Sequence, residues 1–179
     1  RNAEFFSGFS RSPYCTSFPR IVVPESWITS KLKNQIFYVL VPGTSGSVTG
    51  KEWPPSSFSN LAAKVYQQTG WKGIICGVQD EYSLGEQIRK QSDALLQNLS
   101  GQTSLPELAG LLSKSRLTIS NDTGAVFISS AVGTPSVCIV GGGHFGRFLP
   151  YPNLPDQINN LKEIYHKMPC YGCNWECVY

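Results

Sequence analysis

The stretch RLTISNDTGAVFISSAVGTPSVCIVGGG, residues 116–143, decides the fold of this chain. Apolar residues around Ile119 predict a buried strand, and small and apolar residues then repeat at helical spacing until a glycine ends the pattern. Between the two elements lies the turn Asp122-Thr123-Gly124. A carboxylate and unpaired backbone N–H groups therefore meet at a helix N-terminus, which carries about half a positive charge and suits a phosphate or pyrophosphate.

Asp122 has three interpretations on these grounds. As an isolated residue before a helix, it acts as a cap. The run Asp-Thr-Gly-Ala at 122–125 is also typical of aspartic proteases, whose two carboxylates share a proton, but those enzymes consist of strands and this turn leads into a helix. In the third interpretation Asp122 accepts hydroxyls from a sugar whose phosphate is bound by the adjacent N–H groups.

The composition predicts an ordinary globular domain. The chain has 179 residues, 41% of them hydrophobic, and a net charge of +3 without a basic run, so no nucleic-acid partner is expected. No apolar run approaches the roughly 20 residues of a transmembrane span, and no secretory signal is visible. Because the chain begins at Arg1 and ends at Tyr179, directly after a cysteine cluster, we expect a fragment of a longer protein.

The six cysteines lie in different kinds of sequence. Cys76 and Cys138 lie in apolar strand patterns and are expected to be buried thiols. Cys170, Cys173 and Cys177 form a C-x2-C-x3-C cluster, which leaves open structural free thiols, a zinc site and disulfides. The spacing matches no common zinc module closely, so no metal and no other cofactor are expected.

Strand-loop-helix units repeat along the middle of the chain. Besides the strand around Ile119, apolar runs predict strands at 36–41, 73–78, 96–99 and 136–140, with helical patterns between them. This alternation predicts an α/β fold, a doubly wound parallel Rossmann-like sheet of five strands, over residues 35–150. Residues 1–34 are expected to form an irregular linker or strap, and residues 151–179 a C-terminal extension with the cysteine cluster.

Ligands bind doubly wound sheets outside the carboxyl ends of the strands, and four loops are expected there: 43–51, 79–81, 121–124 and 141–147. The first contains Ser47 in a Gly/Ser/Thr run suited to phosphate, although the P-loop pattern is absent. Lys51 is either a solvated lysine or a partner for phosphate charge. Glu81 either favours a helix start or accepts the paired hydroxyls of a ribose.

Three motifs together resemble glycosyltransferase family 9, the ADP-heptose:lipopolysaccharide heptosyltransferase family. They are Gly-Lys-Glu-Trp-Pro at 50–54, Asn-Leu-Ser-Gly-Gln-Thr-Ser-Leu-Pro-Glu-Leu at 98–108, and Ser-Asn-Asp-Thr-Gly at 120–124 with the continuation Ala-Val-Gly-Thr-Pro at 131–135. The similarity runs from about residue 36 to residue 150, with the motifs in order and at the family's spacing. It implies the C-terminal, donor-binding half of a two-domain GT-B enzyme.

The resemblance also implies roles for individual residues. Lys51 would contact the diphosphate, Glu81 the ribose and Asp122 the sugar hydroxyls. Thr123 and Gly124 would bind the phosphates. The family's acceptor site and catalytic base belong to the N-terminal half, so the base in this protein stays unknown.

The chain departs from the family at two places. Phe127 stands where the family usually has a histidine, and the fifth strand is followed by GGGHFGR at 141–147 instead of Gly-Pro-Thr. His144 and Arg147 in that loop are candidates to replace the lost polar group near the phosphates, or are ordinary surface residues. The donor sugar is therefore left open.

The leading functional hypothesis is a glycosyltransferase domain that binds an ADP-heptose-like donor for transfer to lipopolysaccharide or another cell-envelope glycan. The alternatives are a nucleotide-sugar-binding module without transferase activity, which Phe127 favours, and more remotely an aspartic-type hydrolase. The resemblance implies a cytoplasmic protein, peripheral at the inner face of the inner membrane. This chain alone is expected to bind a nucleoside diphosphate but to transfer no sugar.

Overall fold

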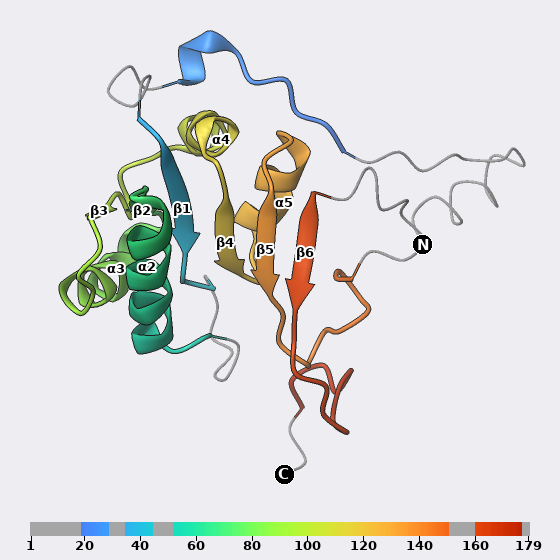
Figure 1. Ribbon diagram of the computed structural model, residues 1–179. Coiled ribbons are helices and arrows are strands. Elements are labelled where there is room, and N and C mark those ends of the chain that lie inside the picture. The colour runs from blue at the N-terminus through green and yellow to red at the C-terminus, as the bar shows by residue number, and fades with distance from the viewer. Residues whose placement is uncertain (1–18, 29–34, 45–51, 151–159, 177–179) are drawn as a thin grey trace, which may run out of the picture.

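The computed structural model describes residues 19–28, 35–44, 52–150 and 160–176. These residues form a six-stranded sheet in the order β3-β2-β1-β4-β5-β6, in which every neighbouring pair is parallel. Figure 1 shows the strands running in one direction, so that all their carboxyl ends lie at the same edge. The strands are β1 Phe37–Val41, β2 Lys72–Ile75, β3 Leu96–Asn98, β4 Thr118–Asn121, β5 Ser136–Ile139 and β6 Leu161–Ile164.

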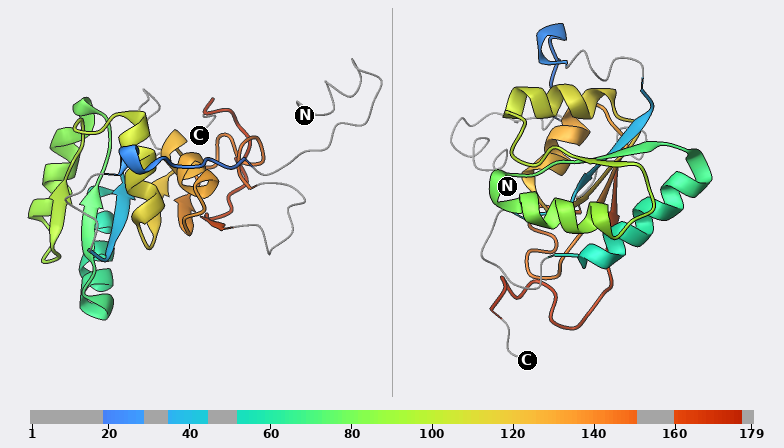
Figure 2. Two further views of the ribbon diagram at one scale, coloured as in Figure 1. Left: turned by 90° about the horizontal axis from the view of Figure 1, so that it is seen from above. Right: turned by 90° about the vertical axis from the view of Figure 1, so that its left-hand side faces the viewer.

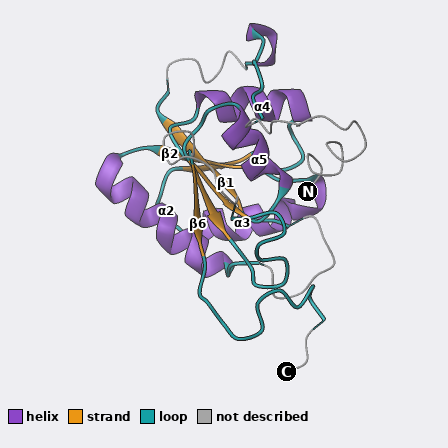
Figure 3. Ribbon diagram, turned by 90° about the vertical axis from the view of Figure 1, so that its right-hand side faces the viewer, coloured by secondary structure: helices purple, strands orange, loops and turns teal. Residues whose placement is uncertain are grey.

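Two pairs of helices cover the two faces of the sheet (Figures 2 and 3). One face carries α2, Pro55–Thr69, and α3, Tyr82–Lys90; the other carries α4, Leu105–Lys114, and α5, Gly124–Ala131. Two short 3-10 helices, η1 at Glu25–Trp27 and η3 at Gln79–Glu81, complete the described elements. The predicted doubly wound parallel α/β sheet is confirmed.

The sixth strand corrects the expected number of five. β6 lies within 151–179, the segment expected to be an extension outside the sheet, and pairs with β5 from Ser136↔Leu161 to Ile139↔Ile164. Its sequence, LKEI, is four residues long and half charged, because it is an edge strand with only Leu161 fully buried. Such a short segment carries too little apolar pattern to be recognised from sequence.

Two apolar layers hold the sheet to its helices. All five residues of β1 are buried, as expected for a central parallel strand covered on both faces. Val39 and Ile74 pack in one cluster with Leu112 of α4. Leu40 and Ile75 pack in the other cluster, on the side of α2 and α3. Burial on both faces fixes the register of the strands, and therefore fixes which loops meet at the carboxyl edge.

The described part of the N-terminal segment, 19–28, crosses the outer surface of α4 and α5 (Figure 1). The Ile21 N–H donates to the Ala131 carbonyl at 2.8 Å, and the Trp27 carbonyl lies against Gly110. A Cβ at Gly110 would come within 2.0 Å of that carbonyl oxygen. A glycine in the middle of α4 is therefore explained by the close approach of the strap. No helix in the described ranges is long and apolar enough to cross a membrane.

The buried hydroxyl group of Tyr38 leads to a prediction about the stability of the fold. Its side chain is fully buried, and its hydroxyl has no hydrogen-bond partner among the described residues. Burial raises the pKa of this phenol, so the group is neutral at every pH of interest. Because an unpartnered buried hydroxyl costs about 1–3 kcal/mol, Tyr38→Phe is expected to keep or raise the free energy of unfolding measured with urea. A loss above about 1 kcal/mol would show that the hydroxyl has a partner in solution.

Candidate functional site

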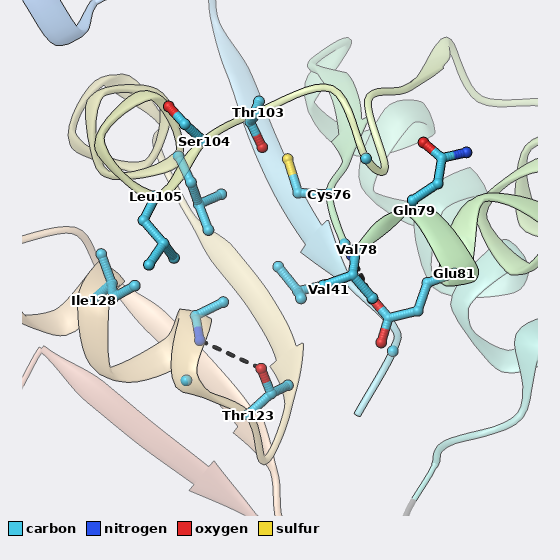
Figure 4. Close-up of a pocket in the computed structure, with 16 residues that line it drawn as sticks. Val41, Cys76, Val78, Gln79, Glu81, Thr103, Ser104, Leu105, Thr123 and Ile128 are labelled. Atoms are coloured by element: carbon cyan, nitrogen blue, oxygen red, sulfur yellow. Dashed lines mark hydrogen bonds between the residues drawn. The ribbon is translucent and has the colours of Figure 1, made fainter. Parts of the chain in front are cut away.

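A cavity of about 460 Å³ opens at the carboxyl edge of the sheet, where sequence analysis placed the ligand. Figure 4 shows Gln79 and Glu81 on one side and Thr123 and Ile128 on the other. The lining comes from the ends of β1 and β2, the 3-10 turn η3, the loop before α4, and the first turns of α4 and α5. Its members are Val41, Gly43, Cys76, Gly77, Val78, Gln79, Glu81, Gly101, Thr103, Ser104, Leu105, Leu108, Thr123, Gly124, Ala125 and Ile128.

The N-terminus of α5 presents backbone donors to this cavity. Thr123 is the N-cap in an extended conformation, and its Oγ1 accepts from the Ala125 N–H at 3.3 Å (Figure 4). A Cβ added at Gly124 would meet no heavy atom within 4 Å, so open space lies beside the first turn. The turn therefore combines the helix dipole, donors and room, the requirements for binding a phosphate group.

Glu81 is held on the opposite side by two glycines and a backbone donor. Its Oε2 accepts from the N–H of Val78, the N-cap residue of η3, at 2.9 Å. A Cβ at Gly43 would come within 2.0 Å of the Glu81 carboxyl group, and one at Gly77 within 2.4 Å. Only glycine at these two positions lets the carboxylate lie between the ends of β1 and β2.

The remaining walls are largely apolar. Leu105, Leu108 and Ile128 line the α4 and α5 side, and Cys76 lies at the end of β2. Cys76 is 1% exposed, and burial raises the pKa of its thiol to about 12. The thiol is therefore protonated at neutral pH and acts as an apolar surface and not as a nucleophile.

The loop before α4 is fixed by a second close approach. Gly101 has φ +74°, and its N–H donates to the Gly77 carbonyl at 2.8 Å. A Cβ at Gly101 would come within 2.1 Å of the Gln79 side chain. Ser104 and Glu107 bond each other reciprocally in a capping box at the start of α4. This cap places the first turn of α4 at the cavity.

Asn121 is a residue of the site that sequence reasoning missed. It is fully buried at the end of β4. Its Nδ2 donates to the Pro42 carbonyl at 2.5 Å, and its Oδ1 accepts from the Trp53 N–H at 3.2 Å. Asn121 thereby ties both ends of the loop between β1 and α2 to the Asp-Thr-Gly turn. The sequence does contain a signal for Asn121, because a polar residue at the end of an apolar strand is expected to be buried and then needs hydrogen-bond partners.

The predicted site residues are only partly gathered at the cavity. Glu81, Thr123 and Gly124 line it, whereas Asp122 is buried, with 6% exposed, and does not belong to the lining. Ser47 and Lys51 fall outside the described residues.

The two candidates from the loop after β5 lie away from the cavity lining. The His144 ring meets the rings of Phe148 and Trp175 edge-on, with centroids 5.7 Å and 6.0 Å apart. The Arg147 guanidinium stacks 5.2 Å from the Phe148 ring centroid. Both side chains are thus engaged with aromatic rings of this outer loop.

The cysteine cluster shows no metal site in the part of the chain that the structure describes. Cys170 and Cys173 are free and half-buried, and Cys177 lies beyond the described residues. Within the described ranges no three His, Cys, Asp or Glu side chains gather closely enough to hold a metal ion.

A second, larger depression of about 890 Å³ runs beside the edge strand β3. It is lined by Lys72, Leu96 and the Glu86–Arg89 ion pair, whose N–O distance is 2.8 Å. None of the four loops expected to bind the ligand contributes to it. The carboxyl-edge cavity is therefore the candidate site.

A doubly wound sheet with its cavity at the carboxyl edge and a helix N-terminus in the wall defines a Rossmann-like class of domain. The profile of "Glycosyltransferase family 9 (heptosyltransferase)" matches residues 10–177. This chain belongs to glycosyltransferase family 9, the heptosyltransferase family, as the three sequence motifs predicted.

The chain is also similar to curated proteins that are named heptosyltransferases. The chain is 24% identical over 122 residues to lipopolysaccharide heptosyltransferase 2 of Escherichia coli K12, a match that covers 66% of this chain and 34% of the relative. It is 30% identical over 95 residues to lipooligosaccharide heptosyltransferase 2 of Haemophilus influenzae, covering 51% of this chain and 27% of the relative. The matches therefore span about a third of the length of these relatives.

Solved structures show the same fold. The E. coli ADP-heptose lps heptosyltransferase II superposes with a TM-score of 0.67 at 20% identity, covering 88% of this chain and 50% of the other. A family 9 glycosyl transferase from Veillonella parvula superposes with a TM-score of 0.71 at 18% identity, covering 90% and 47%. The chain thus has the fold of about half of a heptosyltransferase.

Proposed function

We propose that this chain is the donor-binding half of a GT-B glycosyltransferase that transfers a heptose-like sugar from a nucleoside diphosphate to lipopolysaccharide or another cell-envelope glycan. The observation that carries the proposal is the cavity with Glu81 on one side and the N-terminus of α5 on the other. A nucleoside diphosphate has its hydroxyl pair and its phosphates at separate places, which matches this arrangement. Family membership supports the reaction class.

Each proposed contact follows from the residue's chemistry. Glu81 accepts the ribose hydroxyls, and Thr123 and Gly124 donate to the phosphates. Lys51 neutralises the diphosphate charge, and Asp122 accepts hydroxyls of the sugar. Because negative charge grows on the leaving diphosphate during transfer, Lys51 and the helix N-terminus would stabilise the transition state more than the ground state.

The donor is proposed to be ADP-heptose or a close analogue. A solved structural neighbour, the E. coli heptosyltransferase WaaC, is described in one structure with ADP and in another with ADP-2-deoxy-2-fluoro heptose. The acceptor site and the catalytic base are proposed to belong to a second half, which closes over the cavity. The whole protein is proposed to work at the cytoplasmic side of the inner membrane. Because the cavity of this half is closed on one side only, much of the ligand surface stays exposed to solvent. This chain alone should therefore bind the donor weakly.

A binding module without transferase activity is the second candidate. The Phe127 ring, at the place of the usual family histidine, packs against the apolar cluster of Val126, Cys138 and Leu161. This packing gives residue 127 a structural role that needs no polar group. Transfer by the full-length protein would favour the enzyme over the module.

Two substitutions separate the proposed contacts. Lys51→Ala is expected to weaken ADP and ADP-heptose binding alike, by at least tenfold, because a charge-assisted contact is worth about 1.5–3 kcal/mol. Asp122→Ala is expected to weaken ADP-heptose alone. Titration calorimetry with both ligands measures this, and a loss of ADP affinity equal to that of ADP-heptose in Asp122→Ala would contradict the assignment of Asp122 to the sugar.

A further inference from the structure

The C-terminal segment Met168–Glu176 packs on the glycine loop that follows β5. The Gly172 N–H donates to the Gly142 carbonyl, and the Asn174 N–H donates to the Gly143 carbonyl, both at 2.8 Å. In Figure 1 this segment lies beyond the carboxyl ends of β5 and β6, next to the loop. The chain therefore returns, after β6, to the edge of the sheet that carries the cavity.

Two aromatic side chains of this segment cover the three glycines. A Cβ at Gly141 would come within 2.5 Å of the Trp175 ring, and one at Gly143 within 2.4 Å. A Cβ at Gly142 would come within 3.2 Å of the Tyr171 ring. The run of three glycines is thus explained by direct contact between backbone and rings, and we call Tyr171 and Trp175 the aromatic clamp.

The backbone of the segment is bent to place the clamp. Asn174 and Trp175 have φ values of +53° and +66°, a region that residues with side chains rarely adopt and that persists only where the surroundings fix it. The Trp175 Nε1 is buried without a hydrogen-bond partner among the described residues. Trp175 therefore acts through the packing of its ring and not through its N–H.

The clamped loop leaves the sheet beside the Asp-Thr-Gly turn. Asn121 pairs with Ile139 at the ends of β4 and β5, so the Asp-Thr-Gly turn and the glycine loop both begin within two residues of this last pair. Glu81 lies toward β2, on the other side of β4 in the strand order. In the direction from Glu81 past the N-terminus of α5, the next strand is β5, which is followed by the glycine loop.

We propose that Trp175 and Tyr171 are positioning residues for sugar recognition: they hold Gly141–Gly143 as a rigid wall against which the donor sugar is oriented. The inference rests on the proposed function, because it needs a nucleotide sugar in the cavity. It assigns to the C-terminal segment a role in recognising the sugar, and none in binding the nucleoside diphosphate.

The test compares the dissociation constants of ADP and ADP-heptose by calorimetry in four proteins: wild type, Trp175→Ala, Gly143→Ala and Tyr171→Phe. Trp175→Ala removes the ring, and Gly143→Ala displaces it by the added Cβ. Both are expected to change the ratio of the two constants at least fivefold while leaving the ADP constant within twofold. Tyr171→Phe keeps its ring and loses only the hydroxyl bond to the His166 carbonyl, so it should keep the wild-type ratio.

The double variant Gly143→Ala/Trp175→Ala should have the ratio of Trp175→Ala alone, since the added Cβ no longer meets a ring. An unchanged ratio in both single variants, with ADP binding intact, would overturn the inference. Equal losses for both ligands would also overturn it, because they would indicate a general structural role. Failure of the wild type to bind ADP at all would instead contradict the proposed function.

Discussion

Glu81→Ala is expected to weaken ADP binding by at least tenfold, about 1.4 kcal/mol. The carboxylate lies between Gly43 and Gly77 on the cavity wall, and hydrogen bonds from two ribose hydroxyls to a charged acceptor are each stronger than neutral ones. Calorimetric titration of ADP measures the loss. Inorganic pyrophosphate, which has no ribose, should bind the variant and the wild type equally.

A matched control separates ligand binding from helix capping. Glu107 accepts from the Ser104 N–H, the N-cap donor of α4, at 2.8 Å, as Glu81 accepts from the N-cap donor of η3, but Glu107 does not line the cavity. Glu107→Ala is therefore expected to lower the free energy of unfolding by about 1 kcal/mol and to leave ADP affinity unchanged. If Glu81→Ala behaved in the same way, Glu81 would be only a capping residue.

Asn121→Leu is expected to have the largest effect on stability, a loss of about 2–4 kcal/mol in the free energy of unfolding. The substitution leaves the buried Pro42 carbonyl and the part-buried Trp53 N–H without their partner, and each orphaned group costs about 1–3 kcal/mol, the part-buried one at the low end. ADP affinity should fall as well, because the loop between β1 and α2 loses its tie to the Asp-Thr-Gly turn. Urea unfolding and calorimetry measure the two effects separately.

Asn160 provides the comparison at the opposite edge of the sheet. It precedes β6, and its Nδ2 donates to the Ser130 and Thr134 carbonyls at 3.1 Å and 2.9 Å. Asn160→Leu should also destabilise the protein, but should keep the ADP affinity of the wild type. Equal losses of ADP affinity in both variants would mean that Asn121 acts through global stability and not through the loop.

The sequence predicted the layers of the fold well, because β1 is a continuous apolar run and α5 has small and apolar residues at helical spacing. The turn between β4 and α5 also has a distinctive composition. β6 escaped prediction because an edge strand of four residues with two charges resembles a loop. Glu81 and Thr123 were predicted to lie at the ligand site because ligands bind doubly wound sheets outside the carboxyl ends of the strands, and both residues line the cavity there.

What could not be predicted depends on contacts between distant segments. Asn121 reaches Pro42 and Trp53 across 79 and 68 residues, and Trp175 meets Gly143 only after β6 has turned the chain back. No local sequence pattern predicts such contacts between distant segments. The glycine run at 141–143 was visible in the sequence, but its cause, the aromatic clamp, became visible only in the fold.

The central claim is that the carboxyl-edge cavity binds a nucleoside diphosphate. Its most direct test is a titration of the ¹⁵N-labelled chain with ADP, followed by ¹H–¹⁵N correlation spectra. The account predicts saturable shifts at millimolar ADP or below for Gly124 and Ala125 of α5, for Val78 and Glu81 at the two ends of the η3 turn, and for Gly101. An absence of shifts at millimolar ADP, or shifts confined to the depression around Leu96 and Gln97 beside β3, would contradict it.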